Sequence, residues 1–116
     1  RSTGKEEFHL AWLETHLAEH DRLAAEDVQA TLLELTCTGI ARAIQSCPVD
    51  AGEVYVCGGG SHNQHLMARL AEILAPATVA STSAIGMDPD WVEAATFAWL
   101  ADRTLAGLSG NSPSVT

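Results

Sequence analysis

The chain has 116 residues, of which 47% are apolar and 18% charged, which suits one domain and is too short for two full domains. Its formal charge of −9, with only six Lys and Arg residues, excludes a broad surface for binding a nucleic-acid backbone. No window is apolar enough for a transmembrane helix, and no apolar signal-peptide core follows the first residues, so the sequence predicts a soluble, cytoplasmic protein without a membrane partner.

The first predicted helix begins at a possible capping box, in which the side chains of Thr3 and Glu6 satisfy free amides of the first turn. Its core face is formed by four apolar residues, Phe8, Trp12, Leu13 and Leu17. Near its end, His16 and His20 match the inverted zinc-protease motif HxxEH. A catalytic zinc also needs a third protein ligand and an enclosed cleft, so a solvated helix end is the better interpretation and no metal site is predicted.

The second predicted helix begins around Glu26 and Asp27, and its apolar residues recur at spacings of three and four for about twenty residues. The segment 47–52 ends it, because proline cannot continue a helix and glycine suits a tight turn. The spacing of the three cysteines fits neither a zinc pair nor a closed disulfide framework. We expect three reduced, partly buried thiols, at Cys37, Cys47 and Cys57.

Two short strands are predicted, at residues 53–57 and 78–82, with an amphipathic helix between them that Pro76 stops. Strand, helix and strand in this order favour a parallel right-handed βαβ unit, and ligands of such sheets bind beyond the carboxyl ends of the strands. An all-parallel sheet needs helices on both faces, and two strands make a poor sheet. We therefore expect an α/β, helix-rich chain that lacks part of its own fold.

Three consecutive glycines, Gly58, Gly59 and Gly60, follow the first strand directly. Without a Cβ they allow a ligand close to the backbone, and the unpaired amides at the start of the following helix attract phosphate. In so acidic a chain an anionic nucleotide must be held by backbone amides and a cation. The triplet matches neither a dinucleotide-binding fingerprint nor a P-loop, so on its pattern alone a nucleotide site and a tight turn stay equally open.

Five polar residues, 61–65, follow the glycines. Ser61 or Asn63 could cap the next helix or bond a ribose or base, whereas His62 and His65 are expected to face solvent.

The last predicted helix begins at Asp88, the expected N-cap, with Pro89 at the first helical position. Asp88 and Asp90 are interpreted mainly as capping residues. The residues from Trp91 to Ala101 are apolar almost all round, so this helix is predicted to be buried. Residues 109–116 then form a polar tail.

Glu93 stands out on this apolar helix, because a buried carboxylate is costly unless it is paired or used. The sequence leaves two interpretations open. Glu93 is either a cleft-facing substrate ligand or a structural partner of Arg103 or of a backbone amide.

The motifs taken together resemble the anhydro-N-acetylmuramic acid kinase family over essentially the whole chain. The segments that carry the resemblance are Val56–Asn63 with Leu66 and Met67, Gly86–Ala94, Phe97–Ala101, Ser2–Phe8 and Gly110–Thr116. The resemblance implies the actin-like ATPase and sugar-kinase superfamily, with a ribonuclease H-like fold whose two lobes close around ATP and Mg²⁺. Residues 1–116 are then expected to be a C-terminal fragment of the ATP-binding lobe, completed by a missing N-terminal lobe.

The implied reaction opens the 1,6-anhydro ring of anhydro-N-acetylmuramic acid with water and phosphorylates O6 with ATP. The product is N-acetylmuramic acid 6-phosphate, an intermediate of cell-wall recycling. By resemblance, Gly58, Gly59 and Gly60 fall in the adenosine-binding turn, Asn63 opens its helix, and Glu93 sits where the family reaches the sugar. The catalytic aspartate and the N-terminal phosphate-binding loop have no counterpart here, so the catalytic residues are expected upstream and this chain alone should not turn over.

The alternative from a different class is a non-catalytic nucleotide-binding or oligomerisation module that uses the same glycine turn without sugar chemistry. The long apolar helices are compatible with a homodimer. A zinc hydrolase is the third candidate and rests only on the HxxEH motif.

Overall fold

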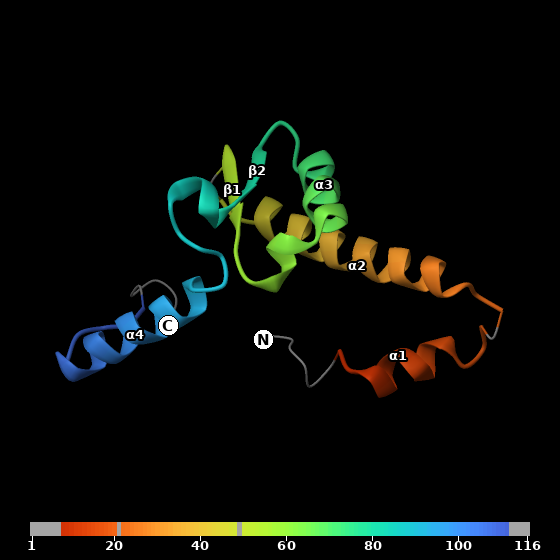
Figure 1. Ribbon diagram of the computed structural model, residues 1–116, viewed down its shortest axis with the longest axis horizontal. Helices are drawn as coiled ribbons and strands as arrows, with labels where there is room; N and C mark the ends of the chain where they lie inside the picture. The colour runs from red at the N-terminus through yellow and green to blue at the C-terminus, as the bar shows by residue number, and fades with distance from the viewer. Residues whose placement is uncertain (1–7, 21, 49, 112–116) are drawn as a thin grey trace. The chain divides into compact units, whose positions relative to one another are not determined.

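The computed structural model describes residues 8–20, 22–48 and 50–111 (Figure 1). The contacts divide the chain into two units, one ending at Leu33 and the other beginning at Glu34. The elements in chain order are α1 (Leu10–Leu17), α2 (Ala25–Gln45), β1 (Glu53–Val56), the 3₁₀ turn η1 (Gly59–His62), α3 (Gln64–Ile73), β2 (Thr78–Ser81), the 3₁₀ turn η2 (Thr82–Ile85) and α4 (Val92–Leu105). None of the described helices is long and apolar enough to cross a membrane.

Helix α1 begins two residues after Phe8, with His9 as its N-cap, whose side chain accepts a hydrogen bond from the amide of Trp12. The predicted capping box at Thr3 and Glu6 lies outside the described residues. The predicted core face is confirmed in part, because Trp12, Leu13 and Leu17 are half-buried while Phe8 is exposed.

The two histidines of the HxxEH motif do not share a helical face. His16 lies in the last turn of α1, where its Nδ1 is 2.8 Å from the carbonyl oxygen of Trp12, whereas His20 lies beyond the helix. Within residues 8–20, 22–48 and 50–111, no three metal-binding side chains cluster in a way that could hold an ion.

Helix α2 confirms the long helix that the spacing predicts, with 21 residues and the carboxylates of Glu26 and Asp27 in its first turn. These carboxylates favour the positive end of the helix dipole. The C-terminal half of α2 packs on α3, where the Cys37 thiol approaches the carbonyl oxygen of Leu66 at 3.9 Å (Figure 1). The buried apolar core lies along this contact and consists of Cys37, Ala41, Leu66, Leu70 and Leu74.

The cysteine prediction is correct in chemistry and only partly correct in burial. All three thiols are free, but Cys47 and Cys57 are exposed and only Cys37 is buried. The difference arises because Cys37 lies in the contact between α2 and α3, whereas the other two lie just outside an element.

The order and the parallel pairing of the predicted βαβ unit are confirmed. Strands β1 and β2 pair in parallel, with Glu53 opposite Thr78 and Val56 opposite Ser81, and α3 connects them (Figure 1). Each strand ends one residue earlier than predicted, because the glycine turn and η2 begin there. The parallel pairing brings the loops that follow the two strands to the same edge of the sheet.

The prediction that the last helix begins at Asp88 is wrong. Residues 88–91 form a separate turn, in which the amide of Trp91 donates to the carbonyl oxygen of Asp88 at 3.1 Å. The Asp88 carboxylate accepts from the amide of Asp90 at 2.9 Å, and α4 begins only at Val92. The sequence signal is ambiguous, because Asp followed by Pro suits the first two positions of a turn as well as a helix start.

The prediction that this helix is buried is also wrong for the described chain. No residue of α4 is buried, and Phe97 and Trp99 are 63% and 52% exposed. The apolar sequence is that of a covered helix, but residues 8–20, 22–48 and 50–111 supply no element that covers it.

An ion pair joins α2 and α3. Arg69 donates from Nε and Nη2 to the two carboxylate oxygens of Glu34, at 2.7 and 2.8 Å. These hydrogen bonds, opposed by partial burial and aided by the charge of Arg69, lower the pKa of Glu34. Its contribution to stability is therefore complete above the ordinary glutamate pKa of 4.5 and is lost as the pH falls through the lower folded-state pKa.

We expect the melting temperature to fall less steeply below about pH 5 in Glu34→Gln than in the unsubstituted protein, followed by circular dichroism. Glu72→Gln is the matched control, because Glu72 binds the same guanidinium at 2.9 Å but from within α3. Identical acid profiles for Glu34→Gln and the unsubstituted protein would contradict this role.

Candidate functional site

The loop that follows β1 turns sharply at Gly58. Gly58 has φ 72° and ψ −174°, a backbone conformation that is essentially restricted to glycine. Its amide donates to the carbonyl oxygen of Pro89 at 2.8 Å, and Pro89 is buried. The glycine turn after β1 is thereby joined to the 88–91 turn that lies beyond β2.

Hydrogen bonds within the turn use the carbonyl of Gly58 and leave two glycine amides exposed. The backbone amide and the side-chain hydroxyl of Ser61 both donate to the carbonyl oxygen of Gly58, at 3.0 and 2.7 Å. Within the described part of the chain, the amides of Gly59 and Gly60 donate to no protein acceptor, and both residues are exposed. These two amides are available to a ligand.

The start of α3 is not available in the same way. Asn63 is the N-cap of α3, and its Oδ1 accepts from the amides of His65 and Leu66 at 3.1 and 3.2 Å. The prediction that unpaired amides of this helix attract phosphate is wrong for these two residues, because the cap already satisfies them. The free donors lie one turn earlier, in the glycines themselves.

A hollow of about 600 Å³ brings the glycine turn and Glu93 together. One wall consists of Cys57, Gly58 and Gly59, and the other consists of Pro89, Asp90, Val92, Glu93, Thr96, Phe97 and Leu100. Of the residues predicted for the site, Gly58, Gly59 and Glu93 line this hollow. Gly60 and Asn63 do not line it.

Glu93 is exposed in the first turn of α4, so the prediction of a buried carboxylate is wrong. Arg103 is not its partner, because the Arg103 Nε donates to the carbonyl oxygen of Ser109 at 2.9 Å and its guanidinium lies 5.4 Å from the ring centroid of Trp99. Among the described residues no ion pair involves Glu93. Its carboxylate is therefore available to accept hydrogen bonds from a ligand.

His62 and Asp90 form a second link between the two loops. The Nε2 atom of His62 lies 2.9 and 3.1 Å from the two carboxylate oxygens of Asp90. The sequence does not reveal this pair, because the residues are 28 positions apart and no periodicity connects them. Both residues also line a neighbouring hollow of about 630 Å³, together with Ser61, Ser81, Ser83, Gly86, Met87, Asp88 and Pro89.

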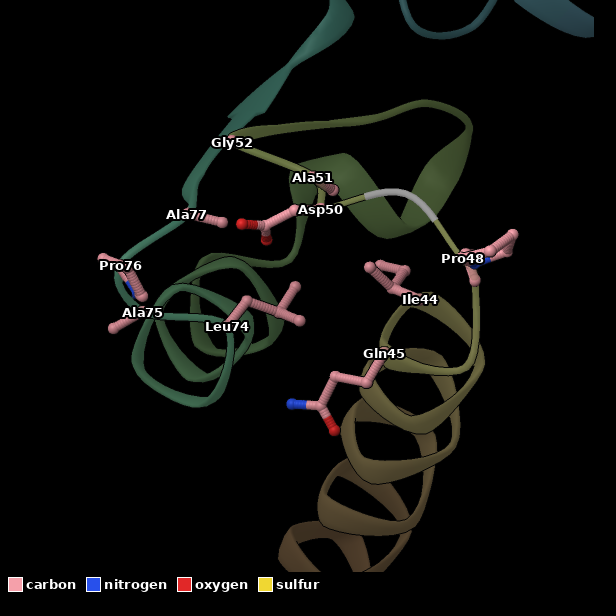
Figure 2. A pocket seen from close by; sticks show the side chains of 11 residues that line it. Ile44, Gln45, Pro48, Asp50, Ala51, Gly52, Leu74, Ala75, Pro76 and Ala77 are labelled. Carbon is pink, nitrogen blue, oxygen red and sulfur yellow. The ribbon is translucent and has the colours of Figure 1, made fainter.

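A third hollow, of about 490 Å³, lies at the opposite edge of the sheet, near the residues that precede each strand (Figure 2). It is lined by the end of α2, the segment before β1 and the connection between α3 and β2. Ile44 and Gln45 come from α2, Leu74 from the end of α3, and Asp50 from the segment before β1. No residue predicted for the site lies in it.

The sequence model of one protein family, described as anhydro-N-acetylmuramic acid kinase, matches residues 1–116. Curated relatives with that name include one from Pseudomonas fluorescens, 55% identical over the whole chain, and one from Pseudomonas savastanoi, 53% identical over the whole chain. A relative from a Shewanella species is 52% identical, again over the whole chain. The chain spans only 31–32% of the length of these relatives.

The backbone of Gly58 yields a second prediction. Gly58→Ala is expected to destabilise the fold by about 1–3 kcal/mol, because alanine is strained at this φ and ψ although its Cβ would meet no atom. Gly59→Ala is the matched control, since a Cβ there also lies in open space and the φ of Gly59 is not positive. Urea unfolding of both variants measures the difference, and an equal loss of stability in the two would contradict the assignment.

Proposed function

We propose a function that proceeds from one premise: the chain belongs to the anhydro-N-acetylmuramic acid kinase family. In our proposal it forms the C-terminal part of such a kinase, within an actin-like ATPase lobe, and is completed by residues that this chain does not contain. The complete kinase would open the 1,6-anhydro ring of anhydro-N-acetylmuramic acid with water and transfer the γ-phosphoryl group of ATP to O6. A cytoplasmic location follows from the need for ATP.

The observation that carries this proposal is the hollow shared by the glycine turn and Glu93. Gly59 offers a free backbone donor and no Cβ, so a nucleotide can lie close against this wall. Glu93 offers an unpaired carboxylate on the other wall, which can accept hydrogen bonds from sugar hydroxyls. Phosphoryl transfer depends mainly on positioning two substrates together, and a hollow with one suitable group on each wall fits this need.

The remaining predicted nucleotide residues have more limited roles in this proposal. Gly60 adds a second exposed amide beside that of Gly59, outside the hollow. Asn63 shapes the turn by capping α3, so its part in nucleotide binding is indirect.

The described residues do not form a binding site for Mg²⁺, because no three metal-binding side chains cluster among them. A kinase commonly binds this ion through the nucleotide phosphates and one or two carboxylates. In our proposal ATP carries the ion into the complete enzyme, and this chain's contribution is to the nucleotide and the sugar.

The second candidate function is a nucleotide-binding or oligomerisation module without sugar chemistry. The observation that favours it is the exposure of α4, on which Phe97, Trp99 and Leu105 are 63%, 52% and 90% exposed. Such side chains suit a contact with another protein surface, which could be a second copy of the chain.

The two functions are separated by calorimetry on a complete kinase in which this chain replaces the segment that it matches in the Pseudomonas fluorescens relative. We expect Mg-ATP to bind, and to bind at least about fivefold more tightly when anhydro-N-acetylmuramic acid is present, because both ligands share one closed cleft. ATP binding without any response to the sugar would favour the module and overturn the kinase proposal.

Glu93 supplies a further prediction in the same chimeric kinase. Glu93→Gln is expected to weaken sugar binding about tenfold or more, because a hydrogen bond to a charged group is replaced by a weaker neutral one, while Mg-ATP binding and the melting temperature stay unchanged. Asp102→Asn is the matched control, since Asp102 is an exposed carboxylate of the same helix that does not line the hollow. A lower melting temperature with unchanged sugar affinity would instead assign Glu93 a structural role.

A further inference from the structure

We propose that His62 and Asp90 are a positioning pair, which holds the wall that carries Glu93 at a fixed distance from the glycine wall. Their proposed role rests on the function proposed above and adds to it two residues to which that function assigns no contact with either ligand. It concerns the geometry between the two ligands rather than the binding of either one.

Helix α4 is attached to the rest of the described chain mainly through the segment that precedes it. Within the described residues α4 buries none of its side chains, so apolar packing by this part of the chain does not fix the direction of the helix. Within the described residues, two polar links join the 57–63 segment to the segment that leads into α4. These links are the hydrogen bond from the Gly58 amide to the Pro89 carbonyl, at 2.8 Å, and the His62–Asp90 contact, at 2.9 and 3.1 Å.

These two links have different geometries. The hydrogen bond at Gly58 holds the second segment at one point, Pro89. The His62 side chain reaches both oxygens of the Asp90 carboxylate, and it starts four residues further along the chain than Gly58. The two links therefore hold the second segment at two different residues, Pro89 and Asp90.

His62 and Asp90 differ in their place relative to the two hollows. Asp90 lies three residues before Glu93 and lines the same hollow, whereas His62 lines the neighbouring hollow and reaches Asp90 from that side. His62 therefore contacts Asp90 from the glycine segment without lining the hollow that contains Glu93. A displacement of the reacting groups by about 1 Å can cost a factor of about 100 in rate, so a link of this kind matters to transfer more than to folding.

The exposure of the pair agrees with such a role. The side chains of His62 and Asp90 are 60% and 58% exposed, and ion pairs this exposed add little to the free energy of unfolding. A pair that adds so little stability is not explained by a purely structural role. The hydrogen bond itself does not require a charged histidine, because Nε2 can donate in the neutral ring as well.

The test uses the chimeric kinase described above and measures kcat and both KM values. His62→Ala is expected to lower kcat about 10- to 100-fold, while the dissociation constant of Mg-ATP alone changes less than about threefold. His62→Gln keeps a side-chain donor and is expected to restore a large part of kcat. His65→Ala is the matched control, because His65 is an exposed histidine three residues on that lines neither hollow.

The partner is tested by a double-mutant cycle. If the pair acts as one unit, His62→Ala combined with Asp90→Ala should lower kcat no further than the more severe single variant. Fully additive losses in kcat would overturn the pairing. Equal effects of His62→Ala and His65→Ala would overturn the positioning role as well.

A readout that does not depend on turnover separates this proposal from the proposed function. Hydrogen exchange of the chimeric kinase, followed by mass spectrometry, should become faster in the peptide around residues 88–97 in His62→Ala and stay unchanged in His65→Ala. If the chimera is inactive but exchange is faster in His62→Ala, the His62–Asp90 link is supported and only the proposed kinase activity is overturned. If His62→Ala has normal activity and unchanged exchange, only the proposed His62–Asp90 link is overturned.

Discussion

Parallel pairing of β1 with β2 is the constraint on which the candidate site depends. Because the two strands run in the same direction, the loops that follow them emerge at one edge of the sheet. The glycine turn comes from the first loop and the 88–91 turn lies beyond the second, and the hydrogen bond from Gly58 to Pro89 joins them. Antiparallel strands would send these loops to opposite edges, and the hollow would have only one wall.

The strength of this arrangement is uneven along the chain. The contact between α2 and α3 buries an apolar core and is reinforced by the two hydrogen bonds from Arg69 to Glu34. The segment that carries Glu93 has no comparable support, since α4 buries nothing within the described residues and depends on two polar links. The two walls of the hollow therefore differ in support: the glycine turn adjoins the packed α2–α3 core, whereas α4 is joined to it by two polar links.

Much of the fold could be predicted from local patterns. The 21 residues of α2 and the two short strands follow from apolar spacing and from β-branched runs. For the N-cap of α3 the sequence offered both Ser61 and Asn63, and the structure has Asn63. The errors occur where one local pattern serves two structures. Asp88 and Pro89 suit a helix start and a turn equally well, and an apolar helix does not reveal whether anything covers it.

The sequence by itself determined the elements, their order, the glycine turn and the family, because each of these depends on neighbouring residues or on ordered motifs. The tertiary structure alone decided which groups are available to a ligand. The first amides of α3, which the sequence predicts to be free for a ligand, are instead bonded to the Asn63 side chain. Gly59 and Glu93, which are far apart in the chain, line one hollow. The contact between His62 and Asp90 also depends on the tertiary structure. Contacts between distant residues are set by strand pairing and loop geometry, and these produce no periodic pattern in the sequence.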